Sequence, residues 1–192
     1  MVIQDYEVQY RIAYDKKLYT DNAGCKIDVP VAEELSLFLR QARIERKKLF
    51  FVGNGGSAGI SVHMTADFLK NAQMRTVDLY APTTLTCLGN DYGYEYVFSK
   101  QLELLADQGD VLVAISSSGN SPNILRAVEA TRAAGGIVVT FTGFKSDNCL
   151  RKMGDRNLYV PSMEYGIVES IHNQILQQVV DEIMALDVQE GR

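Results

Sequence analysis

Residues 111–126 read VLVAISSSGNSPNILR, and this stretch decides the fold. Its first five residues are apolar without alternation, which is typical of a strand buried on both faces of a parallel sheet. Ser121 is a favourable N-cap and Pro122 a favourable first helical residue, so a helix is predicted to begin there. The stretch therefore reads as a buried strand, a polar loop and a helix start.

The loop between this strand and this helix carries hydroxyl groups at Ser116, Ser117, Ser118 and Ser121. Unpaired N–H groups at a helix start, the positive end of the helix dipole and several hydroxyls together favour an anion. The loop contains no Lys or Arg, so hydroxyls and amides must supply the donors. We expect it to bind a phosphate on a small polar molecule. The alternative is a serine-rich solvated turn.

Apolar strand-like runs alternate with helix-like segments from Lys48 onward. Helices are predicted between the strands and after the last strand. Pro161 ends this last strand, which we expect at the edge of the sheet. This alternation predicts an α/β fold with a doubly wound, mainly parallel five-stranded sheet flanked by helices. The predicted strands cover residues 49–52, 76–80, 111–115, 137–141 and 158–160.

Residues 1–46 read as an N-terminal helical extension in two pieces. The first piece is predicted to end with Leu18 and Tyr19, and the second to run from Pro30 to about Arg46. Their aromatic and aliphatic stripes indicate packing, either within the subunit or against another copy. We treat residues 1–192 as one domain, in which residues 47–192 form the α/β core and the C-terminal helix.

Composition and charge exclude several classes of function. The formal net charge of -5 argues against non-specific nucleic-acid binding, which needs a basic face. Three widely spaced cysteines form no disulfide framework, and no signal peptide or membrane-spanning run is visible. We therefore expect a cytoplasmic protein with neither a nucleic-acid partner nor a membrane partner.

A second polar loop, Gly53-Asn54-Gly55-Gly56-Ser57, also follows a predicted strand. In open α/β sheets, ligands bind beyond the carboxyl ends of strands where neighbouring crossovers part, so this loop and the serine loop are predicted to line one crevice. The sequence matches neither GxGxxG nor the P-loop pattern, which counts against a dinucleotide and against ATP hydrolysis.

Three motifs together resemble the sugar isomerase (SIS) family, and specifically its phosphoheptose isomerase branch. They are the Gly53–Ser57 loop, the Gly89-Asn90-Asp91-Tyr92-Gly93-Tyr94 segment and the Ser116–Ser121 loop. The resemblance covers nearly the whole chain. It implies conversion of sedoheptulose 7-phosphate to D-glycero-D-manno-heptose 7-phosphate, in a homotetramer with active sites at subunit contacts. It also implies that the serines bind the phosphate, and that the rest of the substrate is bound by Asn54, Gly55, Gly56, Ser57, Asn90 and Asp91.

The sequence departs from this branch at the positions that handle protons. His63 and Asp67 lie four apart on one helix face, where the family has His and Glu. On the terminal helix the family has Gln and, eight residues later, His, whereas this chain has Glu169 and Gln177. A glutamine hydrogen-bonds but cannot shuttle a proton. A divalent metal, most simply zinc, would be held by His63, Asp67 and Glu169, with Gln177 as a weak fourth ligand.

Two functions remain open from the sequence. The first is a working isomerase of heptose or glycoconjugate biosynthesis, for example of lipopolysaccharide or capsule, with Glu169 or Asp67 as base and Gln177 in the altered catalytic set. The second is a catalytically impaired scaffold of the same fold that binds a sugar phosphate or a protein, as relatives that bind a replication initiator do. The intact binding loops favour the first function, and Gln177 favours the second. A sugar-phosphate sensor is a weaker third idea, because no output domain is attached.

Overall fold

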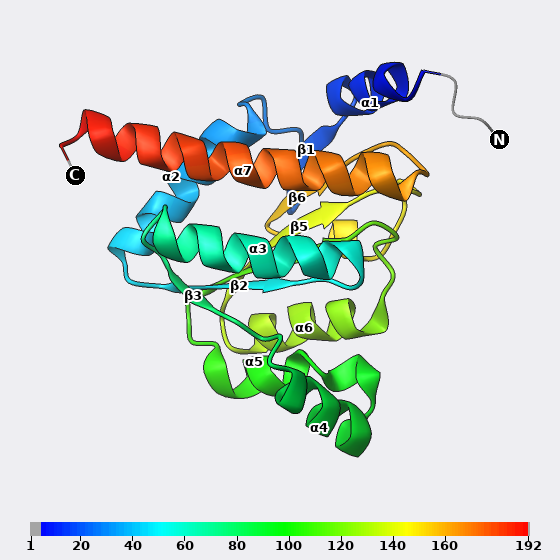
Figure 1. Ribbon diagram of the computed structural model, residues 1–192, viewed down its shortest axis with the longest axis vertical. Helices are drawn as coiled ribbons and strands as arrows, with labels where there is room; N and C mark the ends of the chain where they lie inside the picture. The colour runs from blue at the N-terminus through cyan, green and yellow to red at the C-terminus, as the bar shows by residue number, and fades with distance from the viewer. Residues whose placement is uncertain (1–4, 192) are drawn as a thin grey trace.

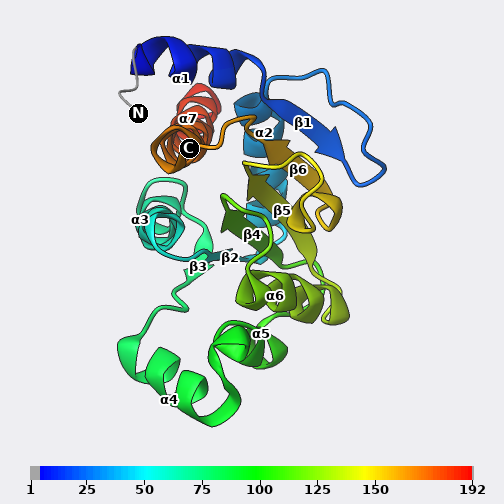
Figure 2. The same ribbon diagram turned by 90° about the vertical axis from the view of Figure 1, so that its right-hand side faces the viewer.

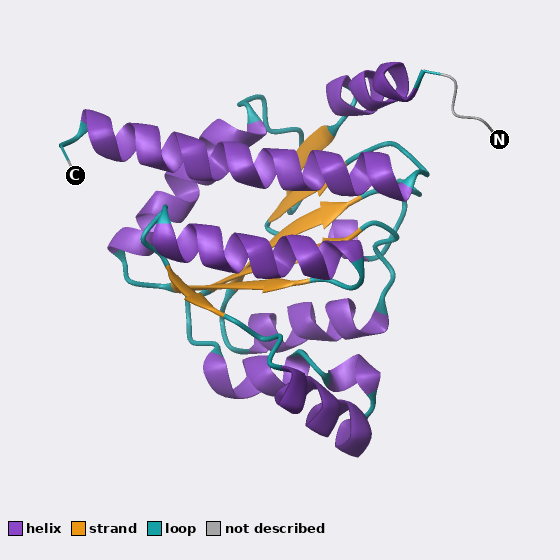
Figure 3. Cartoon of the chain, in the orientation of Figure 1, coloured by secondary structure: helices purple, strands orange, loops and turns teal. Residues whose placement is uncertain are grey.

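The computed structural model describes residues 5–191 and contains one six-stranded sheet with helices on both faces (Figures 1 and 3). Neighbouring strands pair in parallel throughout, except for β1, which pairs antiparallel with β6. This confirms the predicted α/β, doubly wound and mainly parallel class. In spatial order the strands are β1 (Leu18–Asp21), β6 (Arg156–Tyr159), β5 (Ile137–Thr142), β4 (Val111–Ser116), β2 (Lys48–Val52) and β3 (Arg75–Val77).

Each face of the sheet has its own apolar core. Successive side chains of β2 point to opposite faces of the sheet, so Phe51 packs into the first core and Phe50 into the second. Figure 2 shows α3 and α7 on one side of the sheet and α5 and α6 on the other. The first core is covered by α1 (Tyr6–Asp15), α2 (Val31–Ile44), α3 (Gly56–Lys70) and α7 (Tyr165–Gln189), and the second by α4 (Pro82–Tyr92), α5 (Ser99–Leu105) and α6 (Pro122–Ala133).

The N-terminal region differs from the prediction. Leu18 and Tyr19 do not close a helix but belong to β1, which makes the sheet six-stranded instead of five-stranded. Because β1 pairs along the outer side of β6, the strand predicted at the edge of the sheet is an interior one. The second predicted helix, α2, is confirmed, and its buried face packs into the first core. The described part of the N-terminal region, residues 5–46, is therefore built into the sheet and its core, in addition to any role between copies.

The two polar loops follow neighbouring strands. After β2 the chain enters α3 on one face, and after β4 it enters α6 on the other face. The crossovers therefore part between β2 and β4, which is the position where open α/β sheets bind ligands. Two short 3₁₀ helices, η1 (Tyr94–Tyr96) and η2 (Leu150–Lys152), complete the structure. None of the helices among residues 5–191 is long and apolar enough to cross a membrane.

Candidate active site

A cavity of about 350 Å³ lies where the two polar loops meet. The prediction that these loops share one crevice is therefore confirmed. Two residues of α7, Tyr165 and Glu169, close its other side. The loop residues that line it are Asn54, Gly55, Gly56, Ser57, Ser116, Ser117, Ser118 and Ser121.

The serine loop is folded tightly around its first hydroxyl. The Ser116 Oγ accepts a hydrogen bond from Gly119 N at 3.1 Å and lies 3.5 Å from the hydroxyls of Ser118 and Ser121. Gly119 has φ 64°, in the left-handed region that glycine adopts without strain. Ser121 takes the N-cap position of α6 as predicted, yet its side chain makes no capping hydrogen bond. Its hydroxyl therefore stays available to a ligand.

Ser117 gives independent evidence for a polar ligand. Its side chain lines the cavity and is 4% exposed, and its Oγ has no hydrogen-bond partner among the described residues. A buried hydroxyl without a partner costs free energy, and a bound phosphate oxygen is the kind of group that removes this cost. Together with the positive end of the α6 dipole, these hydroxyls offer donors suited to an anion, without a cationic side chain.

The glycine loop is held at its base by an aromatic residue that the sequence reading missed. The Tyr80 hydroxyl accepts from Gly53 N at 2.7 Å and donates to Gly53 O at 2.9 Å. Burial raises the pKa of the Tyr80 hydroxyl to about 12, so it remains protonated and both bonds persist at neutral pH. At the tip of the loop, Gly55 has φ 56°.

Glu169 lies directly against this loop. A Cβ atom built on Gly56 would lie 2.2 Å from Glu169 Oε2 and 2.8 Å from Oε1, so only a glycine leaves room for the carboxylate. Desolvation raises the pKa of Glu169, and the carboxylate has no hydrogen-bond or ion-pair partner within residues 5–191. An unpaired carboxylate with a raised pKa at a cavity wall is suited to accept a proton.

Tyr165 lies one helical turn before Glu169 and was missed by the sequence reading. Its ring packs edge-on against Phe144, with 4.8 Å between the ring centroids, and its side chain is 61% exposed. An i, i+4 relation to Glu169 was the available signal. The ring forms part of the cavity wall.

The four predicted metal ligands are not gathered into one centre. His63 Nε2 lies 3.2 Å from Asp67 Oδ2, and Gln177 Nε2 donates to the same oxygen at 2.9 Å. Glu169 instead faces Gly56. Within residues 5–191, no three His, Cys, Asp or Glu side chains are grouped to hold a metal ion. Three of the four predicted ligands therefore meet at Asp67, apart from Glu169, and zinc binding stays a prediction.

Two predicted sugar-binding residues lie outside the cavity lining. Asn90 and Asp91 are exposed on α4, where Asn90 Nδ2 donates to Asp91 Oδ1 at 2.9 Å. Another residue of the same motif makes the contact with the site: the Tyr94 hydroxyl donates to Asn54 Oδ1 at 2.9 Å. Within one copy the motif therefore contacts the glycine loop through Tyr94, and sugar binding by Asn90 and Asp91 stays a prediction.

His172 is a core residue. It is fully buried, its Nε2 lies 3.1 Å from Thr142 O, and its ring packs edge-on against Phe141. Burial lowers its pKa to about 4, so it is neutral at physiological pH.

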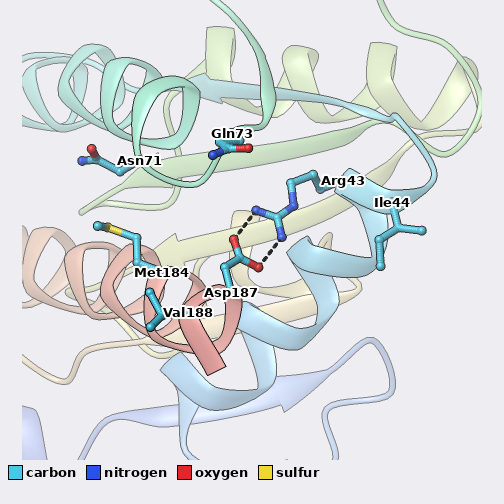
Figure 4. A pocket seen from close by; sticks show the side chains of 7 residues that line it. All are labelled: Arg43, Ile44, Asn71, Gln73, Met184, Asp187 and Val188. Carbon is cyan, nitrogen blue, oxygen red and sulfur yellow. Dashed lines mark hydrogen bonds and ion pairs between the residues drawn. The ribbon is translucent and has the colours of Figure 1, made fainter. Parts of the chain in front are cut away.

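A second cavity of about 400 Å³ lies between the C-terminal ends of α2, α3 and α7 (Figure 4). Its charged groups satisfy each other, because the Arg43 guanidinium donates to both carboxylate oxygens of Asp187 at 2.7 and 2.6 Å. The lining offers no nucleophile and no unpaired base. We therefore assign the chemistry to the cavity beside the serine loop.

Known proteins resemble this chain along nearly its whole length. Residues 33–143 match the family model described as SIS domain. The chain is 30% identical over 185 residues to the phosphoheptose isomerase of Fusobacterium nucleatum, and the match covers 94% of this chain and 92% of that protein. It is 33% identical over 181 residues to the phosphoheptose isomerase of Shewanella denitrificans, with coverage of 88% and 92%.

Solved structures give the same picture. The phosphoheptose isomerase from Neisseria gonorrhoeae superposes with a TM-score of 0.79 at 28% identity, covering 93% of this chain and 92% of that chain. The enzyme from Francisella tularensis superposes with a TM-score of 0.78 at 26% identity and the same coverage.

Proposed function

The chain belongs to the phosphoheptose isomerase family of SIS-domain proteins, and we propose that it converts D-sedoheptulose 7-phosphate to D-glycero-D-manno-heptose 7-phosphate with Glu169 as the base. One observation carries the assignment of the base. Glu169 is the one carboxylate among the cavity-lining residues, and it lies across from the serine loop. The cavity therefore combines a phosphate site with a proton acceptor.

The reaction moves a hydrogen between two carbons of the substrate. The serine hydroxyls and the helix start of α6 would hold the phosphate and thereby fix the sugar chain along the glycine loop. The Glu169 carboxylate takes the proton from C1 of the ketose, which leaves an enediol, and the proton is returned to C2. The hydroxyl proton of O1 leaves as O1 becomes the aldehyde oxygen, and O2 gains one, so the atoms balance.

The other three predicted metal ligands lie outside the cavity lining. Gln177 and His63 both contact Asp67 Oδ2, and none of the three lines the cavity. Asp67 is therefore held by partners that lie away from the cavity, which favours Glu169 over Asp67 as the base. Gln177, predicted in the catalytic set, would then orient Asp67 without transferring a proton.

The experiment is conversion of sedoheptulose 7-phosphate by the purified protein, with and without added zinc. Glu169→Ala should lose turnover while Asp67→Ala retains most of it, and zinc should change neither result. Asp67→Ala losing all turnover while Glu169→Ala retains it would overturn the assignment of the base. Binding without turnover, seen by calorimetry, would instead support the second candidate, a sugar-phosphate-binding scaffold, which Gln177 favours.

We propose a homotetramer in which copies share their active sites. Tyr6, Val8 and Ile12 of α1 are 40–52% exposed, and such exposed apolar side chains favour contact with another copy. No residue of α4 is buried, so Asn90 and Asp91 are accessible to a neighbouring subunit. The proposal places them at the sugar bound by that neighbour, in a cytoplasmic enzyme of heptose and glycoconjugate biosynthesis.

Subunit mixing tests this assembly. Asp91→Ala and the pair Ser118→Ala with Ser121→Ala should each be inactive alone. Mixed tetramers of the two proteins should regain activity, because some contacts then combine an intact serine loop with an intact Asp91. A monomer by light scattering, or mixtures as inactive as their components, would overturn the shared site.

A further inference from the structure

The side-chain amide of Asn54 is bonded from two directions. It forms a reciprocal pair with Asn123, in which each Nδ2 donates to the other's Oδ1 at 2.9 Å. Its Oδ1 also accepts the hydroxyl proton of Tyr94 at 2.9 Å. Asn123 lies near the start of α6 and is 2% exposed, whereas Tyr94 begins η1 and is 64% exposed. Three separate segments thus meet at one amide.

Counting donors and acceptors shows what Asn54 retains for a ligand. A side-chain amide has two N–H donors and one oxygen with two lone pairs. Both lone pairs of Asn54 Oδ1 are taken, by Asn123 and Tyr94, and one N–H is given to Asn123. One N–H of Asn54 remains, in a side chain that lines the cavity.

We propose that Asn123 and Tyr94 are positioning residues that lock the Asn54 amide, so that it presents one N–H donor to an oxygen of the bound sugar chain. The inference rests on the proposed function, since it takes the cavity as the sugar-phosphate site. Without these two partners, the Asn54 amide is free to rotate and to offer its oxygen in place of its N–H. The fixed Asn54 amide therefore favours a sugar atom that accepts a hydrogen bond from its N–H.

The arrangement also gives a role to the motif around Tyr94. The Gly89–Tyr94 segment contacts Asn54 through the exposed hydroxyl of Tyr94. Tyr92, in the same segment, instead lies beside Lys100, whose Nζ is 5.6 Å from the centroid of the Tyr92 ring. Removing the Tyr94 hydroxyl removes one hydrogen bond and leaves the ring in place. Tyr92 is a matched control, because it is another exposed tyrosine of the same motif.

The test measures the affinity for sedoheptulose 7-phosphate and for inorganic phosphate by calorimetry, together with KM and kcat. Tyr94→Phe should weaken sugar-phosphate binding and raise KM by roughly fivefold, the usual effect of one neutral hydrogen bond. Its affinity for inorganic phosphate should be unchanged, because the serine loop is untouched. Tyr92→Phe should match the unaltered protein in every measurement.

A double-mutant cycle separates positioning from a general structural effect. Adding Tyr94→Phe to Asn54→Ala should cause no further loss, because Tyr94 acts through Asn54. Asn123→Ala should weaken sugar-phosphate binding by roughly 10-fold or more, and Tyr94→Phe keeps the inference testable if that buried substitution fails to fold.

The outcomes distinguish this inference from the proposed function. Sugar-phosphate affinity unchanged in Tyr94→Phe, or an equal loss with and without Asn54, would overturn the inference. The inference would also be overturned if the unaltered protein bound the sugar phosphate no more tightly than inorganic phosphate. Tight binding without turnover would overturn the proposed isomerase and leave the lock on Asn54 intact.

Discussion

Gln177 donates a hydrogen bond from Nε2 to Asp67 Oδ2 across 2.9 Å, which links α7 to α3 at the positions where this chain departs from its family. His63 Nε2 lies 3.2 Å from the same oxygen. The three side chains therefore satisfy one another, and none of them lines the cavity. Of the four residues predicted to hold a metal, Glu169 alone faces the substrate site.

Glu169→Gln should lower kcat by roughly 10²- to 10⁴-fold, the usual contribution of a positioned general base, and should leave KM nearly unchanged. The amide keeps the shape of the side chain but cannot accept the proton. Since the base must be deprotonated and desolvation raises its pKa, kcat/KM should increase with pH through a pKa above that of an ordinary glutamate. A pH–rate profile checks both points. If the Glu169→Gln variant showed the same fall of kcat/KM at low pH, that fall would belong to another group.

Gly56→Ala should displace the Glu169 carboxylate without unfolding the protein. The added methyl group would lie 2.2 Å from Oε2, and the end of a flexible side chain moves away from it at little cost. A misplacement of about 1 Å lowers turnover by roughly a hundredfold. Gly59→Ala on the same helix is the control, because a Cβ there meets open space. Steady-state kinetics and denaturant unfolding of both variants test this, and normal turnover in Gly56→Ala would contradict it.

Much of the fold follows from local sequence pattern, and the exceptions have a physical cause. The buried strands and the helix start at Pro122 were predictable because each depends on residues adjacent in sequence. The strand β1 was not, because Leu18 and Tyr19 continue the helical spacing of the preceding tyrosines. Its formation depends on pairing with β6, more than 130 residues away. A local pattern does not contain that pairing.

In the site, too, some features follow from local sequence and others depend on tertiary packing. The polar loops were predictable because their backbone and hydroxyl chemistry is local. The grouping of His63, Asp67 and Gln177 apart from Glu169 depends on how α3 and α7 pack, which residue spacing on either helix leaves undetermined. The space above Gly56 that admits Glu169 and the contact of Tyr94 with Asn54 are likewise tertiary.

Replacing Ser118 and Ser121 by Ala should abolish measurable binding of the sugar phosphate. Both hydroxyls lie 3.5 Å from Ser116 Oγ at the helix start, and hydrogen bonds to a charged group contribute about 1.5–3 kcal/mol each. Each single variant should therefore lose roughly 10- to 100-fold in affinity by calorimetry. Ser146→Ala, in the loop after β5, provides a control. Undiminished affinity in the double variant would refute the phosphate site.

Asp187→Asn should destabilise the fold by about 1.5–3 kcal/mol at pH 7, because it breaks charged hydrogen bonds to Arg43 (Figure 4). The hydrogen bond from Arg43 lowers the pKa of Asp187 in the folded state. Its stabilising effect is therefore complete above the pKa of an ordinary aspartate and is lost as the pH falls through the lowered value.

Denaturant unfolding of this variant at several pH values checks the sign. The difference from the unaltered protein should be largest near neutral pH and should vanish in strong acid. Asp28→Asn is the control, since Asp28 forms an ion pair with Lys26 that is mostly exposed and contributes at most about 1 kcal/mol. A difference that grows as the pH falls would show that another group is responsible.

The combination of Glu169→Gln and Gln177→His recreates the pair of residues that the family has at these positions. We propose Glu169, at the first position, as the base, and Gln177 does not line the cavity, so the combination should recover none of the turnover that Glu169→Gln loses. An imidazole accepts and returns protons near neutral pH, whereas the Gln177 amide does not. It would, however, lie beside the Asp67 carboxylate that Gln177 now contacts.

Zinc gives this prediction a readout that is independent of turnover. The unaltered chain groups no three His, Cys, Asp or Glu side chains within residues 5–191 and should bind zinc weakly, whereas the combined variant places two imidazoles next to Asp67. Imidazole and carboxylate are good zinc ligands, so elemental analysis after dialysis should find zinc retained in this variant. Gln177→His alone separates the two effects: it should gain zinc and keep the Glu169-dependent activity. Zinc gained with no recovery of turnover would show that an imidazole at position 177 does not reach the substrate, and that Glu169 alone supplies the base in this chain.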